Sequence, residues 1–247
     1  MHSTNFSRGP GGMLFAAGLG SRLKPWTDHH PKALAVVNGK TLLQRNIEYL
    51  QTHGIYELIV NVHHFADQII DAVEKNNGWG STITISDESD EVLETGGGLK
   101  KAAWYFAGDE DFVVMNADIL TDMNLSAMIA QHKQQKNLAT LAVCDRDTSR
   151  YFLFDEMHVL SGWRNIKTGE EKIVRRSDTL VQKAFSGIHV IDPELLRLNR
   201  LEGKFSMVDV YLELAKDNII SYYDHTGAQL IDVGKPESIA RAEAVFL

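Results

Sequence analysis

Alternation between short apolar runs and amphipathic segments is the feature of this sequence that most constrains its fold. The apolar runs cover residues 13–17, 58–62, 82–85, 112–115 and 138–143. Segments with a helical spacing of apolar side chains separate them, over residues 41–54, 69–77, 99–106 and 124–136. This order predicts an α/β fold with a Rossmann-like, mostly parallel sheet and helices on both of its faces. Ligands of such sheets bind beyond the carboxyl ends of the strands.

The second half of the chain is less regular and predicts a small antiparallel insertion. Residues 151–154 and 159–163 have the pattern of short strands, and residues 180–191 return to the sheet. Because no repeat or convincing linker interrupts the chain, we expect one domain over residues 13–247. The glycine-rich start, residues 1–12, is expected to form a flexible leader.

Composition limits what the protein binds. With 247 residues and 44% hydrophobic content, the chain can bury a full core. A net charge of -8 and the lack of a basic block argue against a nucleic-acid partner. The single cysteine, Cys144, cannot form an internal disulfide, so we expect a structural cysteine and a cytoplasmic protein. No stretch approaches the roughly 20 apolar residues of a membrane span, so no membrane partner is expected.

A glycine turn with nearby cations follows the first apolar run. Residues 16–22 read Ala-Ala-Gly-Leu-Gly-Ser-Arg, and Lys32 follows within Pro-Lys-Ala-Leu. Glycines let backbone N–H groups approach an anion closely, and Arg22 and Lys32 add positive charge, as a polyphosphate site requires. An ordinary turn with two surface cations explains the same spacing. The dinucleotide loop does not match, because Leu23 replaces its third glycine, and no Gly-Lys-Ser/Thr ending of an NTPase loop follows Gly20.

The same segment resembles the signature of the sugar-1-phosphate nucleotidyltransferases, A-A-G-x-G-x-R-L-x-P-L-T followed by P-K-x-L, with Trp26 in place of the leucine of P-L-T. Further family motifs follow in order at Leu93–Gly98, Asn116–Asp118, Phe185–Ile188 and Val233–Pro236. The resemblance therefore extends from residue 13 to about residue 247. It implies a GT-A-like nucleotidyltransferase fold and an enzyme of the EC 2.7.7 type, which makes a nucleotide sugar and pyrophosphate from an NTP and a sugar-1-phosphate.

The resemblance also assigns the catalytic residues. Several negative charges meet in this reaction, so we expect catalysis by positioning and charge neutralisation with Mg²⁺ as the cofactor. Asp118 and Asp232 match the family's two metal aspartates, although Ala117 replaces the glycine that commonly precedes the first. Arg22 and Lys32 match residues that contact the triphosphate and would stabilise the leaving pyrophosphate. Solvated surface charges are the alternative for each, and only the fold can bring together aspartates 114 positions apart.

The glycine-rich segment Leu93–Gly98 indicates the nucleotide. It reads L-E-T-G-G-G where the commoner family form reads L-G-T-A-G-A, and it looks most like the N-acetylmuramate-1-phosphate uridylyltransferases. We therefore favour UTP and a role in cell-wall nucleotide-sugar synthesis, with a flexible hinge as the alternative reading of the glycines. Just upstream, Glu88 or Glu91 is a candidate for contacting an edge of the base. The alternative is that both belong to a solvated acidic loop. The predicted nucleotide-binding residues are Ala16, Ala17, Gly18, Gly20, Arg22, Lys32, Glu94, Gly96, Gly97 and Asn116.

The sugar side is less defined. Ser186, Gly187 and Asp209 match family segments next to the sugar, although Asp209 serves equally as a helix N-terminal charge. The family's Glu-Lys-Pro contact to the sugar phosphate is missing, and Lys172 or Lys183 is the expected substitute. Residues 163–165, Trp-Arg-Asn, are read as a core aromatic with exposed neighbours.

Two other functions fit the same pattern. A metal-dependent glycosyltransferase would use a finished nucleotide sugar, and a nucleotide-sugar sensor would keep the fold without catalysis. The intact glycine turn and charged residues favour the transferase over both. The sugar remains open among muramic, heptose, mannose and glucose phosphates, and so do GTP and CTP as donors. The sequence also leaves the oligomeric state open, a homo-oligomer included.

Overall fold

The computed structural model describes residues 11–108 and 110–247. The first ten residues of the predicted leader therefore lie outside the described residues, and Gly12, its last residue, already belongs to the first strand. Within the described residues, every helix is too short or too polar to cross a lipid bilayer.

A parallel half-sheet forms the first part of the fold. Its strands are β1 (Gly12–Phe15), β4 (Glu57–Val62), β5 (Thr82–Asp87) and β6 (Phe112–Asn116). They lie in the order β5-β4-β1-β6, and each neighbouring pair is parallel. The carboxyl ends of β1 and β6 therefore meet at one edge, where the chain runs into the glycine turn and into Asp118.

One long strand joins this half-sheet to the rest of the molecule. Strand β12 (Val181–Ile191) runs antiparallel to β6 and, on its other side, to β8 (Ala139–Cys144), which pairs in parallel with β13 (Ile220–Asp224). The start of β12 pairs with β9 (Arg150–Phe154), and β10 (Leu160–Asn165) and β11 (Glu170–Ile173) complete an antiparallel extension. The α/β sheet and its antiparallel insertion are confirmed.

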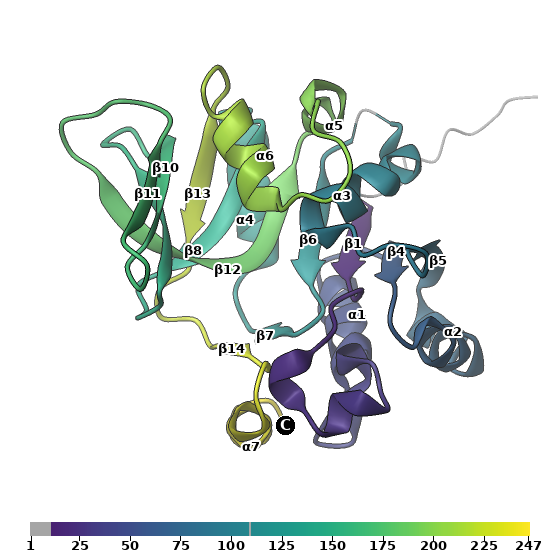
Figure 1. The fold of residues 1–247 in the computed structure, drawn as a ribbon. Helices are drawn as coiled ribbons and strands as arrows, with labels where there is room; N and C mark the ends of the chain where they lie inside the picture. Colours follow the sequence, from purple (N-terminus) through teal and green to yellow (C-terminus); the bar gives the residue numbers. More distant parts are fainter. Residues whose placement is uncertain (1–10, 109) are drawn as a thin grey trace, which may run out of the picture.

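Helices cover both faces of the sheet because side chains alternate along the strands (Figure 1). Leu14 and Met115 face the core beneath α1 (Leu42–Thr52), α2 (Ala66–Lys75) and α4 (Leu125–Gln135). Met13 and Val114 face the other core, beneath α3 (Glu94–Lys101), α5 (Glu194–Leu198) and α6 (Met207–Leu214). Two apolar layers therefore enclose the strands that end at the predicted site.

A small ribbon brings the C-terminal segment to this edge of the sheet. Strand β14 (Leu230–Asp232) pairs antiparallel with β7 (Ile119–Thr121), which directly follows Asp118. The Val233 N–H donates to the Asp118 carbonyl over 2.8 Å. Helix α7 (Pro236–Val245) then packs beside the loop that follows β1, where Ala242 and Leu23 share an apolar cluster (Figure 1).

The triple glycine opens α3 and packs against the protein's own chain. The N–H groups of Gly96 and Gly97 both donate to the Phe205 carbonyl, over 2.9 and 3.1 Å. A Cβ at Gly96 would lie 2.5 Å from the Phe205 ring, and one at Gly97 would lie 2.6 Å from the Gly203 carbonyl oxygen. The backbone of the segment around Phe205 therefore approaches these glycines closely, which leaves no room for a side chain at either position.

Replacing Gly97 by alanine should destabilise the protein. The added methyl would gain about 1 kcal/mol in helix propensity, but it meets a backbone carbonyl that cannot move aside cheaply and disturbs the bond to Phe205. We expect Gly97→Ala to lower the free energy of unfolding by about 2 kcal/mol in urea denaturation. Gly108→Ala is the control, because no described atom outside its chain neighbours lies within 4 Å of that Cβ. Equal stability of the two variants would contradict this packing role.

Candidate active site

The two glycines of the turn after β1 have different surroundings. Gly20 has a left-handed φ of +62°, and a Cβ there would lie 2.9 Å from the Thr27 side chain and 3.0 Å from that of Lys32. At Gly18, by contrast, a Cβ would have no described atom beyond its chain neighbours within 4 Å. Gly20 therefore shapes the loop, and Gly18 leaves open space beside the backbone for a ligand.

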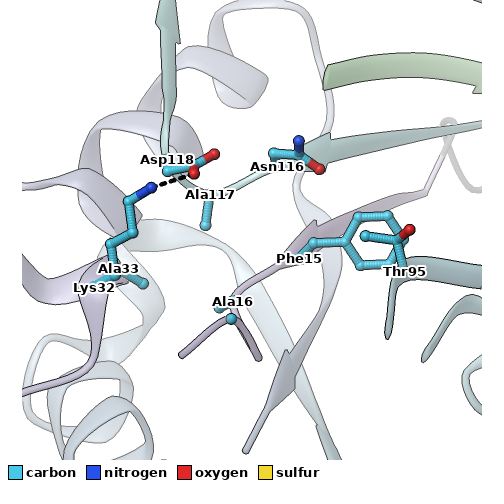
Figure 2. A pocket seen from close by; sticks show the side chains of 9 residues that line it. Phe15, Ala16, Lys32, Ala33, Thr95, Asn116, Ala117 and Asp118 are labelled. Carbon is cyan, nitrogen blue, oxygen red and sulfur yellow. Dashed lines mark hydrogen bonds and ion pairs between the residues drawn. The ribbon is translucent and has the colours of Figure 1, made fainter. Parts of the chain in front are cut away.

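All of the predicted catalytic residues meet in one charged cluster. The Lys32 ammonium, on a short 3-10 helix at Lys32–Leu34, forms an ion pair with Asp118 (Figure 2). It also lies 3.8 Å from Asp232 Oδ1. Arg22 Nη2 lies 3.4 Å from Asp232 Oδ2. The β7–β14 pairing thus brings the two aspartates together, as the resemblance required. Lys32 is the more enclosed cation, with a side chain 12% exposed against 57% for Arg22.

A cavity of about 190 Å³ opens beside this cluster (Figure 2). It lies at the carboxyl ends of β1 and β6, where ligands of parallel sheets are expected. Its lining residues are Phe15, Ala16, Gly18, Lys32, Ala33, Thr95, Asn116, Ala117 and Asp118. Backbone, ammonium and carboxylate groups therefore face one space, which suits an anion bound together with a cation.

A second cavity, of about 170 Å³, shares Phe15, Gly18 and Thr95 with the first. The shared residues make the two spaces neighbours. The second cavity is further lined by Ala17, Leu19, Asn61, Glu88, Val92 and Glu94. Its walls are largely apolar with a few polar groups, the composition typical of a small-molecule site.

The sequence left two interpretations of Glu88, a contact with a base edge or a solvated loop, and the structure contradicts the second. Glu88 is only 1% exposed, and its Oε1 accepts a hydrogen bond from Asn61 Nδ2 over 2.8 Å. Burial raises the pKa of the Glu88 carboxyl above its usual range. The solvated-loop alternative is therefore wrong for Glu88, whereas Glu91 is exposed and outside the lining. Asn61 was missed, although a polar residue within the apolar run 58–62 was a usable signal.

Other predicted nucleotide-binding residues have mainly structural contacts. Gly96 and Gly97 are buried under the segment around Phe205 and are outside the lining of both cavities in the described part of the chain. Their expected contact with the nucleotide stays a prediction. Ala17 and Glu94 line the second cavity and Asn116 the first, so the structure places these three beside open space.

The predicted sugar-binding residues are outside the lining of both cavities and have contacts within the described part of the chain. Ser186 is 1% exposed, and its hydroxyl lies 2.7 Å from His225 Nε2. Gly187 has a φ of +75°, and a Cβ there would lie 2.7 Å from Asn116 Nδ2. Asp209 accepts from the Ser206 N–H and hydroxyl in a capping box at the start of α6. Their contact with a sugar stays a prediction, and Asp209 has the helix-terminal role given as its alternative.

The two lysines proposed for the acceptor phosphate are engaged elsewhere. Lys183 forms ion pairs with Asp145 and Asp224, over 2.8 and 2.7 Å. Lys172 lies 5.7 Å from the centre of the Trp163 ring, on the antiparallel extension. Trp163 itself packs against the core of the α3 face, in agreement with its reading as a core aromatic.

The aspartate pair fits a hard divalent cation held jointly with a substrate. In the described residues, no group of three or more histidine, cysteine or acidic side chains could hold a metal ion. Mg²⁺ commonly takes only one or two protein carboxylates and completes its shell with water and phosphate oxygens. Asp118 and Asp232 already converge on a single cation, the Lys32 ammonium, so their carboxylates are placed to share one.

Comparison with known proteins identifies the class. A family model described as nucleotidyl transferase matches residues 11–246, so the chain belongs to this family. It is 29% identical over 237 residues to N-acetylmuramate alpha-1-phosphate uridylyltransferase from Caulobacter vibrioides, covering 94% of this chain and 95% of that protein. The predicted membership of the sugar-1-phosphate nucleotidyltransferases is confirmed.

Proteins whose names specify a guanine nucleotide are also similar to this chain. The chain is 26% identical over 243 residues to mannose-1-phosphate guanyltransferase from Yarrowia lipolytica, covering 96% of this chain and 64% of that protein. Its fold is similar to that of HddC from Yersinia pseudotuberculosis in complex with GMP-PN, with a TM-score of 0.78 and 24% identity. That likeness covers 97% of this chain and 100% of HddC. Similarity therefore establishes the fold and family without selecting the base.

Replacing Lys32 should expose the carboxylate pair to metal. In Lys32→Met the ammonium no longer competes for Asp118 and Asp232, so Mn²⁺ should bind without nucleotide and stabilise the folded state. We expect millimolar MnCl₂ to raise the melting temperature of the variant by about 3 °C more than that of the unaltered protein. Lys24→Met, which removes an exposed pair with Asp28, is the control. Equal Mn²⁺-induced shifts of the melting temperature for Lys32→Met and the control would contradict the prediction that the Lys32 ammonium and the metal compete for the same two carboxylates.

Proposed function

We propose that the protein transfers a uridylyl group from UTP to a sugar-1-phosphate and releases pyrophosphate. The observation that carries this proposal is the convergence of Arg22, Lys32, Asp118 and Asp232 beside the first cavity. The full-length likeness to a uridylyltransferase supports the choice of UTP. N-acetylmuramate-1-phosphate, the acceptor in the name of that relative, is the first sugar to test. Such a product would serve cell-wall synthesis in the cytoplasm.

The chain's own groups position the reactants. The backbone at Gly18 and the cations of Lys32 and Arg22 would bind the phosphates, and the two cations would neutralise the pyrophosphate as it leaves. An oxygen of the sugar phosphate attacks the α-phosphorus, and the bond from that phosphorus to the pyrophosphate oxygen breaks. Both nucleophile and leaving group belong to the substrates, so positioning is the protein's main contribution.

Asp118 and Asp232 are the residues that would hold Mg²⁺ in this proposal. When bound, the ion supplies positive charge to phosphate oxygens and lowers the repulsion between the two anionic substrates. The Lys32 ammonium, released from the carboxylates, would then be available to the triphosphate. This accounts for the close approach of one cation, Lys32, to two carboxylates that come from separate parts of the chain.

The proposal is tested by measuring pyrophosphate release with UTP, MgCl₂ and a panel of sugar-1-phosphates. We expect Asp118→Asn to lower kcat by at least about 100-fold, because a neutral amide neither holds Mg²⁺ nor pairs with Lys32. Unchanged circular dichroism and melting temperature would show that the variant is folded. Asp217→Asn, at an exposed position after α6, is the matched control.

Two outcomes would contradict the proposal. Full turnover by Asp118→Asn would remove this aspartate from the reaction. Release of a nucleoside diphosphate from a nucleotide sugar, with no pyrophosphate from any NTP, would favour a glycosyltransferase.

A further inference from the structure

We propose that Glu88 selects the nucleobase by accepting a hydrogen bond from a ring N–H, so that uracil, thymine and guanine are accepted and cytosine and adenine are rejected. This inference rests on the proposed function, because it takes the second cavity as the site of the base. It extends that function by naming the residue that reads the base and the chemical class of base that it admits.

The position of the second cavity makes it the natural place for a base. It shares Phe15, Gly18 and Thr95 with the cavity beside Lys32 and Asp118, so a nucleotide with its phosphates in one can extend into the other. Phe15, Leu19 and Val92 give it apolar walls. A planar ring gains from such walls by losing contact with water, and the few polar groups then decide its identity.

A chain of hydrogen bonds fixes one oxygen of the Glu88 carboxyl as an acceptor. The Ala16 N–H donates to Asn61 Oδ1 over 2.8 Å, and Asn61 Nδ2 donates to Glu88 Oε1 over 2.8 Å. Because the backbone N–H of Ala16 can only donate, the Asn61 oxygen must face Ala16 and its NH₂ group must face Glu88. The carboxylate is thereby held at the cavity wall in one orientation.

The neighbouring helix preserves this arrangement. A Cβ at Gly98 would lie 2.7 Å from Glu88 Oε1 and 2.9 Å from Asn61 Nδ2. The third glycine of the segment therefore leaves room for the Asn61–Glu88 pair. Glu94, the other carboxylate of the cavity, is exposed and lies 4.0 Å from Lys204. Water can therefore hydrogen-bond to the Glu94 carboxylate whatever base is present.

The chemistry of the bases gives the direction of selection. Uracil and thymine present N3–H and guanine presents N1–H, which are donors, whereas cytosine N3 and adenine N1 are lone-pair acceptors. A carboxylate oxygen that faces a lone pair gains no hydrogen bond from the base and suffers electrostatic repulsion. Sites that require a substrate hydrogen bond can reject an analogue without it by about 10⁴-fold, far more than apolar contacts allow.

The test uses Glu88→Gln in the full chain, with binding and turnover measured for UTP, GTP, CTP and ATP. Glutamine keeps the size of glutamate, and its oxygen remains the acceptor for Asn61. Its NH₂ group replaces the other carboxylate oxygen, so that a donor takes the place of an acceptor, which suits the lone pair of cytosine N3. We expect the unaltered protein to prefer UTP or GTP over CTP by at least about 100-fold, and the variant to narrow the preference for UTP over CTP by at least about 30-fold.

Glu91→Gln, at an exposed neighbouring position outside the cavity lining, is the matched control and should keep the original preference. An unchanged base preference in Glu88→Gln would overturn the proposal. An equal loss of binding for all four nucleotides would also overturn it, because it would show that Glu88 only stabilises the fold. Calorimetric binding without added sugar separates the two proposals. Base-selective binding without pyrophosphate release would refute the transferase function alone, and equal binding of all bases would refute the role of Glu88.

Discussion

The pairing of β14 with β7 is the interaction on which the site depends. The chain crosses half of the sheet, the antiparallel extension and α6 between Asp118 and Asp232, yet three residue pairs of this ribbon return it to the same edge. Backbone hydrogen bonds fix the register, and a shift by one residue would turn the Asp232 side chain to the opposite face. Apolar packing of Ile231 and Val233 against Leu23 then holds the ribbon beside the loop that follows β1.

Charge is concentrated where this ribbon meets the loop after β1. Two carboxylates and two cations at short range would be costly to bury, but they are only partly enclosed and neutralise one another. The arrangement is therefore stable without ligand and can be rearranged by one. A substrate with several negative charges would attract the cations, and a divalent cation would attract the carboxylates. The two exchanges of ion-pair partner therefore become favourable together.

Local patterns predicted much of this architecture, and its limits have physical causes. The apolar runs around Leu14 and Val114 marked buried strands, and the glycine turn was placed correctly at a strand end. Helix α3 begins at Glu94, earlier than the predicted residue 99, because packing on Phe205 outweighs the low helix propensity of three glycines. The direction of β12 was not predictable, since an apolar run has the same pattern in a parallel or an antiparallel pair. Asn61 and Glu88 became partners only through the adjacency of β4 and β5.

The lack of space for a side chain at Gly98, beside Glu88, also has an evolutionary consequence. A methyl group at position 98 and a glutamate at position 88 would compete for the same volume, since the added carbon would lie 2.7 Å from the carboxylate oxygen. The commoner family form of this segment ends in alanine at that position. Relatives with alanine there are therefore expected to carry a shorter or displaced side chain in place of Glu88. The two positions would then covary, and a change of base preference during divergence would require substitutions in two segments of the chain.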